Sequence, residues 1–231
     1  MASSQVHEMF LGSPLFLGLS KEGLTRLLSS CEEHTYQHGE ILFRQGDPGD
    51  SLHIVTEGRL KVFVAAEPGD EIMVAILGRG DCVGELSLID GEPRSATVEA
   101  LGPARTVALL RTEFQRALRE NPRMIEALVN TLADRLRQTT TLAADLAFLD
   151  LRGRLAKKLL DLAAEHGKRS PYGAIEIAVP LTQFDLAAMM GVTRESISKQ
   201  IGWFEQAGAI ERHGRHIVIL DEDVLRRRIT Y

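Results

Sequence analysis

The first half of the chain alternates short apolar stretches with turns that contain glycine. Ten of the 20 glycines fall between positions 39 and 102. Between them lie stretches of strand-forming residues, at 40–43, 51–55, 60–64, 71–76, 96–100 and 106–110. Short strands separated by turn signals every 8–12 residues are typical of a small antiparallel roll or barrel. We therefore expect an N-terminal antiparallel β-roll of the jelly-roll type.

After residue 110 the apolar positions repeat with the period of an α-helix. A helix is predicted at 111–119 and, after a break at Asn121 and Pro122, a long helix at 123–149. One stripe along the long helix recurs at alternating spacings of four and three: Ile125, Val129, Leu132, Leu136, Thr139, Ala143 and Leu146. Because a sustained stripe of this kind favours pairing with a second copy of the same helix, we expect a homodimer.

One position of this stripe is polar. Thr139 stands where an apolar residue belongs, and Thr140 follows it. A polar residue in a helix seam can fix the register of the two helices. Alternatively, the two hydroxyls face a polar ligand that binds against the helix.

The last third of the chain predicts a winged helix-turn-helix. Helices are expected at 152–165, 182–190, 193–207 and 222–229, with a polar loop at 166–173 and a hairpin at 209–220. Ala187, Gly191 and Ile197 have the spacing of a helix-turn-helix, in which a small residue permits close approach, glycine permits the turn and an apolar residue locks the second helix. Thr193 is a suitable N-cap for that second helix.

The second helix of this motif begins with side chains that can reach base edges, because a recognition helix inserts its N-terminal end into the major groove. These side chains are Arg194, Glu195, Ser196 and Lys199. The hairpin tip at 213–215 is placed to meet phosphate. A structural helix corner with a solvated charged face is the alternative, and a metal site at His213 and His216 lacks further ligands.

Residues 84–96 combine a turn, a carboxylate and an arginine. A strand ends at Gly84, a helical turn begins at Glu85, and the chain returns through Arg94 and Ser95. Arginine can hold a phosphate through two parallel hydrogen bonds, and the N–H groups at the start of a helical turn attract anions. A carboxylate suits the hydroxyls of a ribose. The segment predicts a nucleotide monophosphate pocket, unless Glu85 and Arg94 merely pair with each other.

The composition excludes several classes of protein. The 231 residues are 44% apolar and 26% charged, as in an ordinary soluble protein. Residues 1–138 carry 14 Lys and Arg against 20 Asp and Glu, and 168–231 carry 9 against 8, so bulk charge does not decide whether nucleic acid is a partner. Two cysteines, Cys31 and Cys82, cannot build a disulfide framework or a zinc site. Neither a signal peptide nor a membrane span is predicted, so we expect a cytoplasmic protein without a membrane partner.

Together these motifs resemble the Crp/Fnr family of transcription regulators, and within it the catabolite-activator branch most closely. Residues 84–87 and 94–96 look like the phosphate-binding cassette of cyclic-nucleotide-binding domains, and Thr139-Thr140, 146–150 and 193–195 complete the pattern. The resemblance covers about residues 10–220. It implies an α+β chain of three parts: a cyclic-nucleotide-binding β-roll at 1–120, a dimerisation helix at 121–149, and a winged helix-turn-helix DNA-binding domain at 150–231.

The resemblance also assigns site residues. The cyclic nucleotide would contact Gly84, Glu85, Leu86, Ser87, Arg94, Ser95, Ala96, Thr139 and Thr140, with Glu85 on the ribose 2′-OH, Arg94 and Ser95 on the phosphate, and Thr140 reaching the ligand of the partner subunit. Bases would be contacted by Arg194, Glu195 and Lys199. Phosphates of double-stranded DNA would be contacted by Thr182, Gln183, Ser196, His213 and Arg215. The DNA site would be pseudo-palindromic, and RNA polymerase is the further partner that the family implies.

The effector expected from the resemblance is cAMP rather than cGMP, on the strength of Ser95 and Thr139. An iron–sulfur cluster would need more cysteines, and none of the seven histidines lies in the cassette or on the long helix as a haem ligand, so no metal or haem is expected. Lys199 departs from the arginine of the family's best-known member, and a lysine discriminates less between bases.

Two other functions stay open at this point. The chain could be a cyclic-nucleotide-binding module that acts through a protein partner, or a family member that binds DNA without cAMP control. No catalytic motif (GxGxxG, P-loop, HExxH or GxSxG) occurs in the sequence, so we do not expect an enzyme.

Overall fold

The computed structural model describes residues 14–16, 19–67 and 70–229. The chain divides into two compact units, which we describe separately. The N-terminal unit comprises the residues up to Val64 together with Val74–Gln138, and the C-terminal unit comprises Ala65–Met73 together with the residues from Thr139 onward. Over the described stretches, no helix combines the length and apolarity that crossing a bilayer would require.

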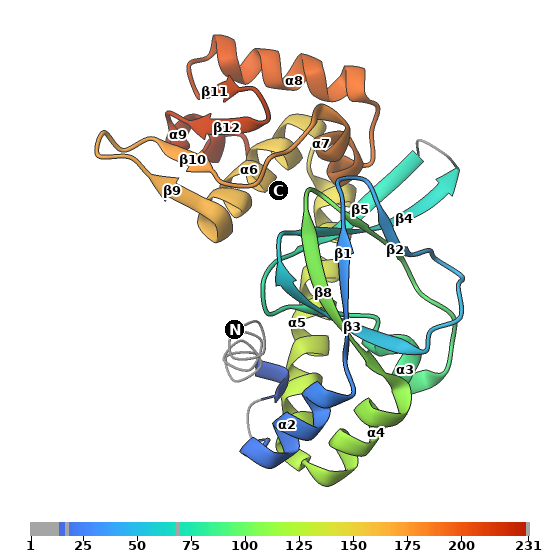
Figure 1. Cartoon of the computed structure of the whole chain (residues 1–231). Helices are drawn as coiled ribbons and strands as arrows, with labels where there is room; N and C mark the ends of the chain where they lie inside the picture. The colour runs from blue at the N-terminus through green and yellow to red at the C-terminus, as the bar shows by residue number, and fades with distance from the viewer. Residues whose placement is uncertain (1–13, 17–18, 68–69, 230–231) are drawn as a thin grey trace. The chain divides into compact units, whose positions relative to one another are not determined.

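The N-terminal unit is built on two four-stranded sheets, apart from the end of β4 and the start of β5, which fall within Ala65–Met73 (Figure 1). The first has the order β1-β8-β3-β6, with β1 at Glu32–Tyr36, β8 at Ala104–Leu110, β3 at Ser51–Glu57 and β6 at Cys82–Val83. The second has the order β2-β7-β4-β5, with β2 at Ile41–Phe43, β7 at Thr97–Ala100, β4 at Leu60–Glu67 and β5 at Asp70–Leu77. The pairs β1–β8, β3–β8, β3–β6, β2–β7 and β4–β7 run antiparallel. The predicted antiparallel β-roll is confirmed.

Strand β3 shows how the two apolar clusters of this unit form. Leu52 and Ile54 lie in a cluster that helical residues such as Phe114 and Met124 complete. Val55 lies in a second cluster with residues of both sheets, among them Val98. Because successive side chains of a strand point to opposite faces, one strand can supply both clusters.

Helices cover the first of these clusters. They are η1 at Pro14–Phe16, α2 at Lys21–Ser29, α3 at Glu85–Asp90, α4 at Arg111–Glu120 and the N-terminal part of α5 at Pro122–Phe148.

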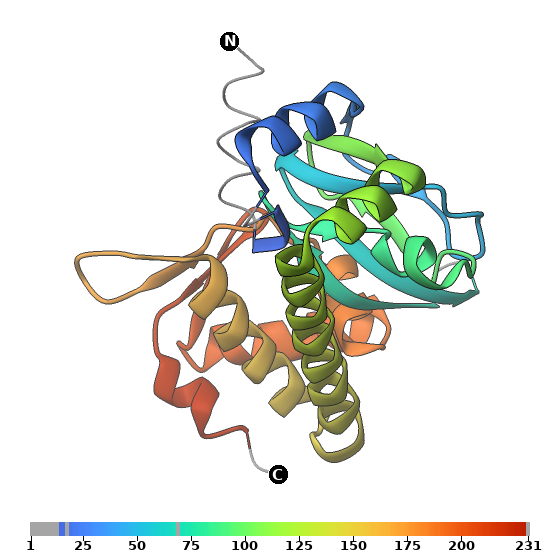
Figure 2. The ribbon, with the colours of Figure 1, turned by 90° about the horizontal axis from the view of Figure 1, so that it is seen from below.

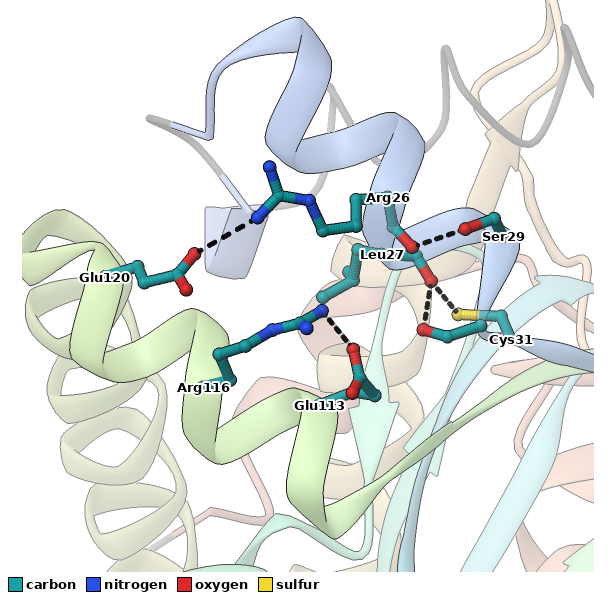
Figure 3. A network of polar contacts seen from close by, with 8 residues as sticks. Arg26, Leu27, Ser29, Cys31, Glu113, Arg116 and Glu120 are labelled. Atoms are coloured by element: carbon teal, nitrogen blue, oxygen red, sulfur yellow. Dashed lines mark hydrogen bonds and ion pairs between the residues drawn. The ribbon is translucent and has the colours of Figure 1, made fainter.

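Figure 3 shows the polar contacts around α2 and α4, where the Arg26 guanidinium lies 3.9 Å from the Glu120 carboxylate. In the same region the Cys31 thiol donates to the Leu27 carbonyl oxygen at 3.2 Å. Burial, helped by the charge of Glu113, raises the pKa of that thiol to about 12, so it stays protonated at neutral pH.

Helix α5 runs unbroken over its whole length (Figure 2). Met124 and Leu128 are buried, whereas Ile125, Val129 and Leu136 of the predicted stripe are 47%, 57% and 68% exposed. These three positions therefore lie on a different face of the helix from the residues that pack on the roll, whereas Leu132 of the same stripe packs against the first apolar cluster.

The C-terminal unit contains the helix-turn-helix. Its elements are α6 at Leu151–His166, β9 at Gly167–Arg169, β10 at Ile175–Ile177, α7 at Gln183–Met190, α8 at Arg194–Gln206, β11 at Ile210–His213, β12 at His216–Ile219 and α9 at Glu222–Arg226. The strands form one sheet of order β11-β12-β10-β9. Gly191 ends α7 with a φ of 62°, and Ala187 and Ile197 are buried, as the motif requires. The predicted winged helix-turn-helix is confirmed.

Several local predictions were wrong or incomplete. Helix α2 and strands β1 and β6 were not predicted. The loop expected at 166–173 is in part a strand, because Gly167–Arg169 forms β9 and pairs antiparallel with β10. All three residues of β9 are exposed, so the segment carries no alternation of apolar and polar side chains that would indicate a strand. The last helix ends at Arg226 rather than at 229.

Candidate functional site

The candidate nucleotide site begins at the junction of β6 and α3. Gly84 caps α3 with a φ of 93°, a conformation that glycine adopts without strain. A methyl group at this position would collide with the guanidinium of Arg94. Glu85, the first residue of α3, is only 1% exposed. The sequence Gly84-Glu85 thus turns a carboxylate inward beside an arginine.

Arg94 is also buried, and its guanidinium is held by backbone oxygens. One terminal nitrogen donates to the Gly84 carbonyl oxygen at 2.9 Å, and the other donates to the Ser51 carbonyl oxygen at 2.7 Å. The guanidinium carbon lies 4.1 Å from the centroid of the Phe43 ring. Desolvation lowers the pKa of Arg94, although an arginine remains charged at any physiological pH.

The partner of Glu85 is Arg135 on α5, and not Arg94. Arg135 forms an ion pair with Glu85 Oε1 and donates a second hydrogen bond to the Cys82 carbonyl oxygen. The alternative interpretation of the cassette, in which Glu85 and Arg94 simply pair with each other, is therefore wrong. Arg135 was missed by the sequence analysis, although a lone cation on the buried face of a helix, seven residues after Leu128, is a detectable signal.

Two buried polar atoms of this cluster have no hydrogen-bonding partner. They are the Nε–H of Arg94 and the Oε2 oxygen of Glu85. Buried polar groups in proteins are nearly always paired, so each exception calls for an explanation. One of these atoms can donate to an anion, and the other can accept from a hydroxyl.

The remaining residues of the cassette divide between surface and interior. Leu86 and Ser95 are exposed, whereas Ser87 and Ala96 are buried. Ser87 packs so closely against Gly49 that a methyl group on Gly49 would collide with it. Thr139 and Thr140 are exposed on α5, where Thr139 lies one helical turn after Arg135.

A buried histidine supports the strand on which Arg94 rests. His53 of β3 hydrogen-bonds Thr106 at 3.2 Å and lies 3.4 Å from the hydroxyl of Ser51. Burial, together with the positive charges of His34 and Arg94, lowers the pKa of His53 to about 4. The imidazole is therefore neutral at physiological pH.

The second candidate site lies on α7, α8 and the β11–β12 hairpin. Arg194, Glu195 and Lys199 are exposed on α8. Thr193 caps that helix, because its hydroxyl accepts a hydrogen bond from the Ser196 N–H at 3.3 Å. The hairpin turns at Gly214 with a φ of 66°. The structure thus presents the three predicted base-reading side chains together on one helix.

The predicted phosphate-contacting residues differ in how they are engaged. Thr182 is the N-cap of α7 and shares a capping box with Asp185. Gln183 accepts from Arg194 at 3.4 Å, which joins the first helix of the motif to the second. The hydroxyl of Ser196 lies 3.0 Å from that of Thr193. At the hairpin, His213 lies 3.0 Å from Glu211, and both His213 and Arg215 are exposed.

In the part of the chain that the structure describes, no three His, Cys, Asp or Glu side chains gather as metal ligands would.

Comparison with known proteins assigns a domain family to each of the two regions. A family model described as a cyclic nucleotide-binding domain matches residues 33–121, and one described as a Crp-like helix-turn-helix domain matches residues 153–228. A CRP-like cAMP-activated global transcriptional regulator of Mycobacterium tuberculosis is 33% identical over 96% of this chain and 98% of its own length. The cAMP-activated global transcriptional regulator CRP of Salmonella typhimurium is 30% identical over 91% of this chain and 98% of its own length. Among solved structures, a mutant of CooA from Carboxydothermus hydrogenoformans aligns with a TM-score of 0.76 and 26% identity, over 89% of this chain and 90% of that protein.

Proposed function

Since the chain belongs to the Crp/Fnr family of transcription regulators, we propose that it is a homodimeric DNA-binding regulator controlled by cAMP. The nucleotide binds at the Glu85–Arg94 cassette, and α8 contacts the bases of a pseudo-palindromic site on double-stranded DNA. The protein performs no catalytic step and acts in the cytoplasm.

The observation that carries the nucleotide proposal is the pair of unpartnered buried atoms in the cassette. The Arg94 Nε–H can donate to a phosphate oxygen, and Glu85 Oε2 can accept from a ribose hydroxyl. A buried polar atom without a partner costs about 1–3 kcal/mol, and a bound nucleotide would remove this cost at both atoms. Relatives named as cAMP-activated support adenine as the base of the ligand, and Ser95 and Thr139 are the residues of this chain assigned to that preference.

The dimer is supported by the exposed apolar stripe of α5. Ile125, Val129 and Leu136 are large apolar side chains that a single chain leaves in solvent. In the proposed mechanism, cAMP favours one arrangement of the paired α5 helices by contacting Thr139 of its own subunit and Thr140 of the other. A ligand shifts such an equilibrium only through its differential affinity for the two states.

The DNA and polymerase assignments rest on position. Arg194, Glu195 and Lys199 read bases, while Thr182, Gln183, Ser196, His213 and Arg215 contact phosphates. RNA polymerase is proposed to contact the β9–β10 hairpin, where Tyr172 is 97% exposed.

The test of the nucleotide site is thermal unfolding with and without cAMP and cGMP. Ligand at 100 times its Kd stabilises the native state by about 2.7 kcal/mol, which raises Tm by at least about 5 °C for a chain of this size. The Arg94→Gln variant should lose this shift. Arg105→Gln, which removes an exposed arginine of the same unit, should keep it. Equal shifts in both variants, or a larger shift with cGMP than with cAMP, would contradict the assignment.

A further inference from the structure

The one tryptophan of the chain is contacted by two arginines that come from opposite ends of the C-terminal unit. The guanidinium carbon of Arg152, near the start of α6, lies 4.3 Å from the centroid of the Trp203 ring. That of Arg228, just after α9, lies 4.5 Å from the same centroid. The segment after α9 is held closely here, since a methyl group on Gly153 would come within 2.9 Å of the Arg228 carbonyl oxygen.

Neither of these two positive charges forms an ion pair within the described residues. Neither Arg152 nor Arg228 has a carboxylate within 4.0 Å among residues 14–16, 19–67 and 70–229, and the polar contact of Arg152 is with the neutral Gln200 amide at 2.9 Å. Arg226 differs, because Glu222 pairs with it at 3.0 Å. Because the two guanidinium carbons lie 4.3 and 4.5 Å from one ring centroid, they are at most about 9 Å apart, roughly one Debye length at physiological ionic strength, so part of their mutual repulsion remains. An anion bound by both would turn this repulsion into attraction.

The position of Trp203 on α8 indicates which anion this is. Ile197, Ile201 and Phe204 are the buried face of the helix. Ser196, Gln200 and Trp203 recur at helical spacing along one flank of the exposed face. The opposite flank carries Glu205, which forms an ion pair with Arg212 of the wing strand β11 at 2.6 Å. The wing and the arginine pair therefore lie on opposite flanks of the helix.

A helix in the major groove has a phosphate backbone on each side. An α-helix with its side chains is about 10–12 Å across and nearly fills a groove about 12 Å wide. If α8 reads bases and the wing meets one backbone, the flank of Trp203 faces the other backbone.

We propose that Arg152 and Arg228, held on Trp203, form a phosphate clamp on the flank of α8 opposite the wing. The inference rests on the proposed function as a DNA-binding regulator. The clamp contacts backbone phosphate only, so it adds affinity without adding base preference. It also gives the segment after α9 a direct role in binding.

The test is the salt dependence of binding to a mixed-sequence duplex of about 40 base pairs, long enough for two half-sites one helical turn apart. With cAMP present, binding is followed by the anisotropy of labelled DNA. The slope of log K against log salt falls by about 0.9 for each phosphate that a variant no longer neutralises. Arg228→Gln should lower the slope by about 0.9 per subunit. Arg226→Gln, which removes the same charge two residues earlier from an existing ion pair, should leave the slope unchanged.

Arg228→Lys is the control that separates loss of the positive charge from a purely structural effect. A lysine keeps the positive charge but loses the planar stacking on the ring, so it should retain most of the wild-type slope. Equal slopes for Arg228→Gln and Arg226→Gln would overturn the clamp while leaving the proposed function standing. If the wild-type protein binds no duplex with or without cAMP, the proposed function fails and the clamp fails with it.

Discussion

The carboxylate of Glu85 and the guanidinium of Arg135 form an ion pair that joins the start of α3 to the middle of α5. Glu85 is almost fully buried, whereas the Arg135 side chain is 31% exposed. Arg135 also donates a hydrogen bond to the Cys82 carbonyl oxygen. It therefore contacts β6 just before Gly84 and α3 just after it. The candidate nucleotide site is therefore physically connected to the helix that carries Thr139 one turn further on.

Replacing Arg135 with glutamine should destabilise the N-terminal unit, because the Glu85 carboxylate would be left buried without its partner. Losing a charged hydrogen bond of this kind costs about 2–3 kcal/mol when one partner stays partly solvated. Urea unfolding measures the change. Arg137→Gln provides the control, since Arg137 is 75% exposed and its pair with Asp134 lies on the same helix. Removing it should change the free energy of unfolding by less than about 0.5 kcal/mol, and a comparable loss in both variants would argue against a special role for Arg135.

A second prediction separates backbone strain from loss of the site. Gly84 and Gly80 both have a φ of 93°, so alanine is strained to a similar extent at either position. A methyl group on Gly84 also displaces the Arg94 guanidinium, whereas one on Gly80 meets no atom within 4 Å. Gly80→Ala should lose about 1–2 kcal/mol of stability and Gly84→Ala at least as much, but only Gly84→Ala should lose the cAMP-induced rise in Tm. If Gly84→Ala still binds cAMP, the observed position of the Arg94 guanidinium is not needed for cAMP binding.

The elements that the sequence predicted well are those whose pattern is local. The helix-turn-helix follows from Ala187, Gly191 and Ile197, because each meets a geometric need of two adjacent helices. The break between α4 and α5 follows from Pro122, which is tolerated as the first residue of a helix and not inside one. Thr193 was identified as a cap for the same reason, since a cap acts on the next turn of its own chain.

The elements that were missed depend on partners far along the chain. Strand β1 has the polar sequence Glu-Glu-His-Thr-Tyr and forms a strand because β8 pairs with it, from Glu32 opposite Ala108 to Tyr36 opposite Ala104. Arg135 is a similar case, because its partner lies 50 residues earlier in the chain. The pairing of β1 leaves no periodic signal in the sequence, and the helical spacing that marks Arg135 does not reveal its partner. The assigned contacts of Thr139, Thr140 and the DNA-binding residues remain predictions.

The buried imidazole of His53 predicts a stability that depends on pH. Its pKa is lowered from 6.5 to about 4 in the native state, so between these values the unfolded chain binds a proton that the native protein does not. The free energy of unfolding therefore falls as the pH drops from 6.5 to 4, by about 3 kcal/mol from this residue. His53→Gln keeps a neutral group able to hydrogen-bond Thr106 and should flatten this part of the profile, measured by urea unfolding at a series of pH values. An unchanged profile would mean that other groups dominate acid unfolding.

The junction of α5 and α6 should be rigid, because an ion pair spans the two residues that separate them. Lys157 Nζ lies 2.6 and 2.7 Å from the two carboxylate oxygens of Asp145, and both side chains are less than 20% exposed. Arg154 donates to the Leu149 carbonyl oxygen at 3.2 Å and so satisfies part of the end of α5. A double-mutant cycle of Asp145→Ala and Lys157→Ala should give a coupling energy of about 1–3 kcal/mol. The same cycle on the exposed pair Glu222 and Arg226 should give less than about 1 kcal/mol, because solvent screens it. Equal coupling in the two cycles would show that the pair at the junction is no stronger than a surface contact and does not make the junction rigid.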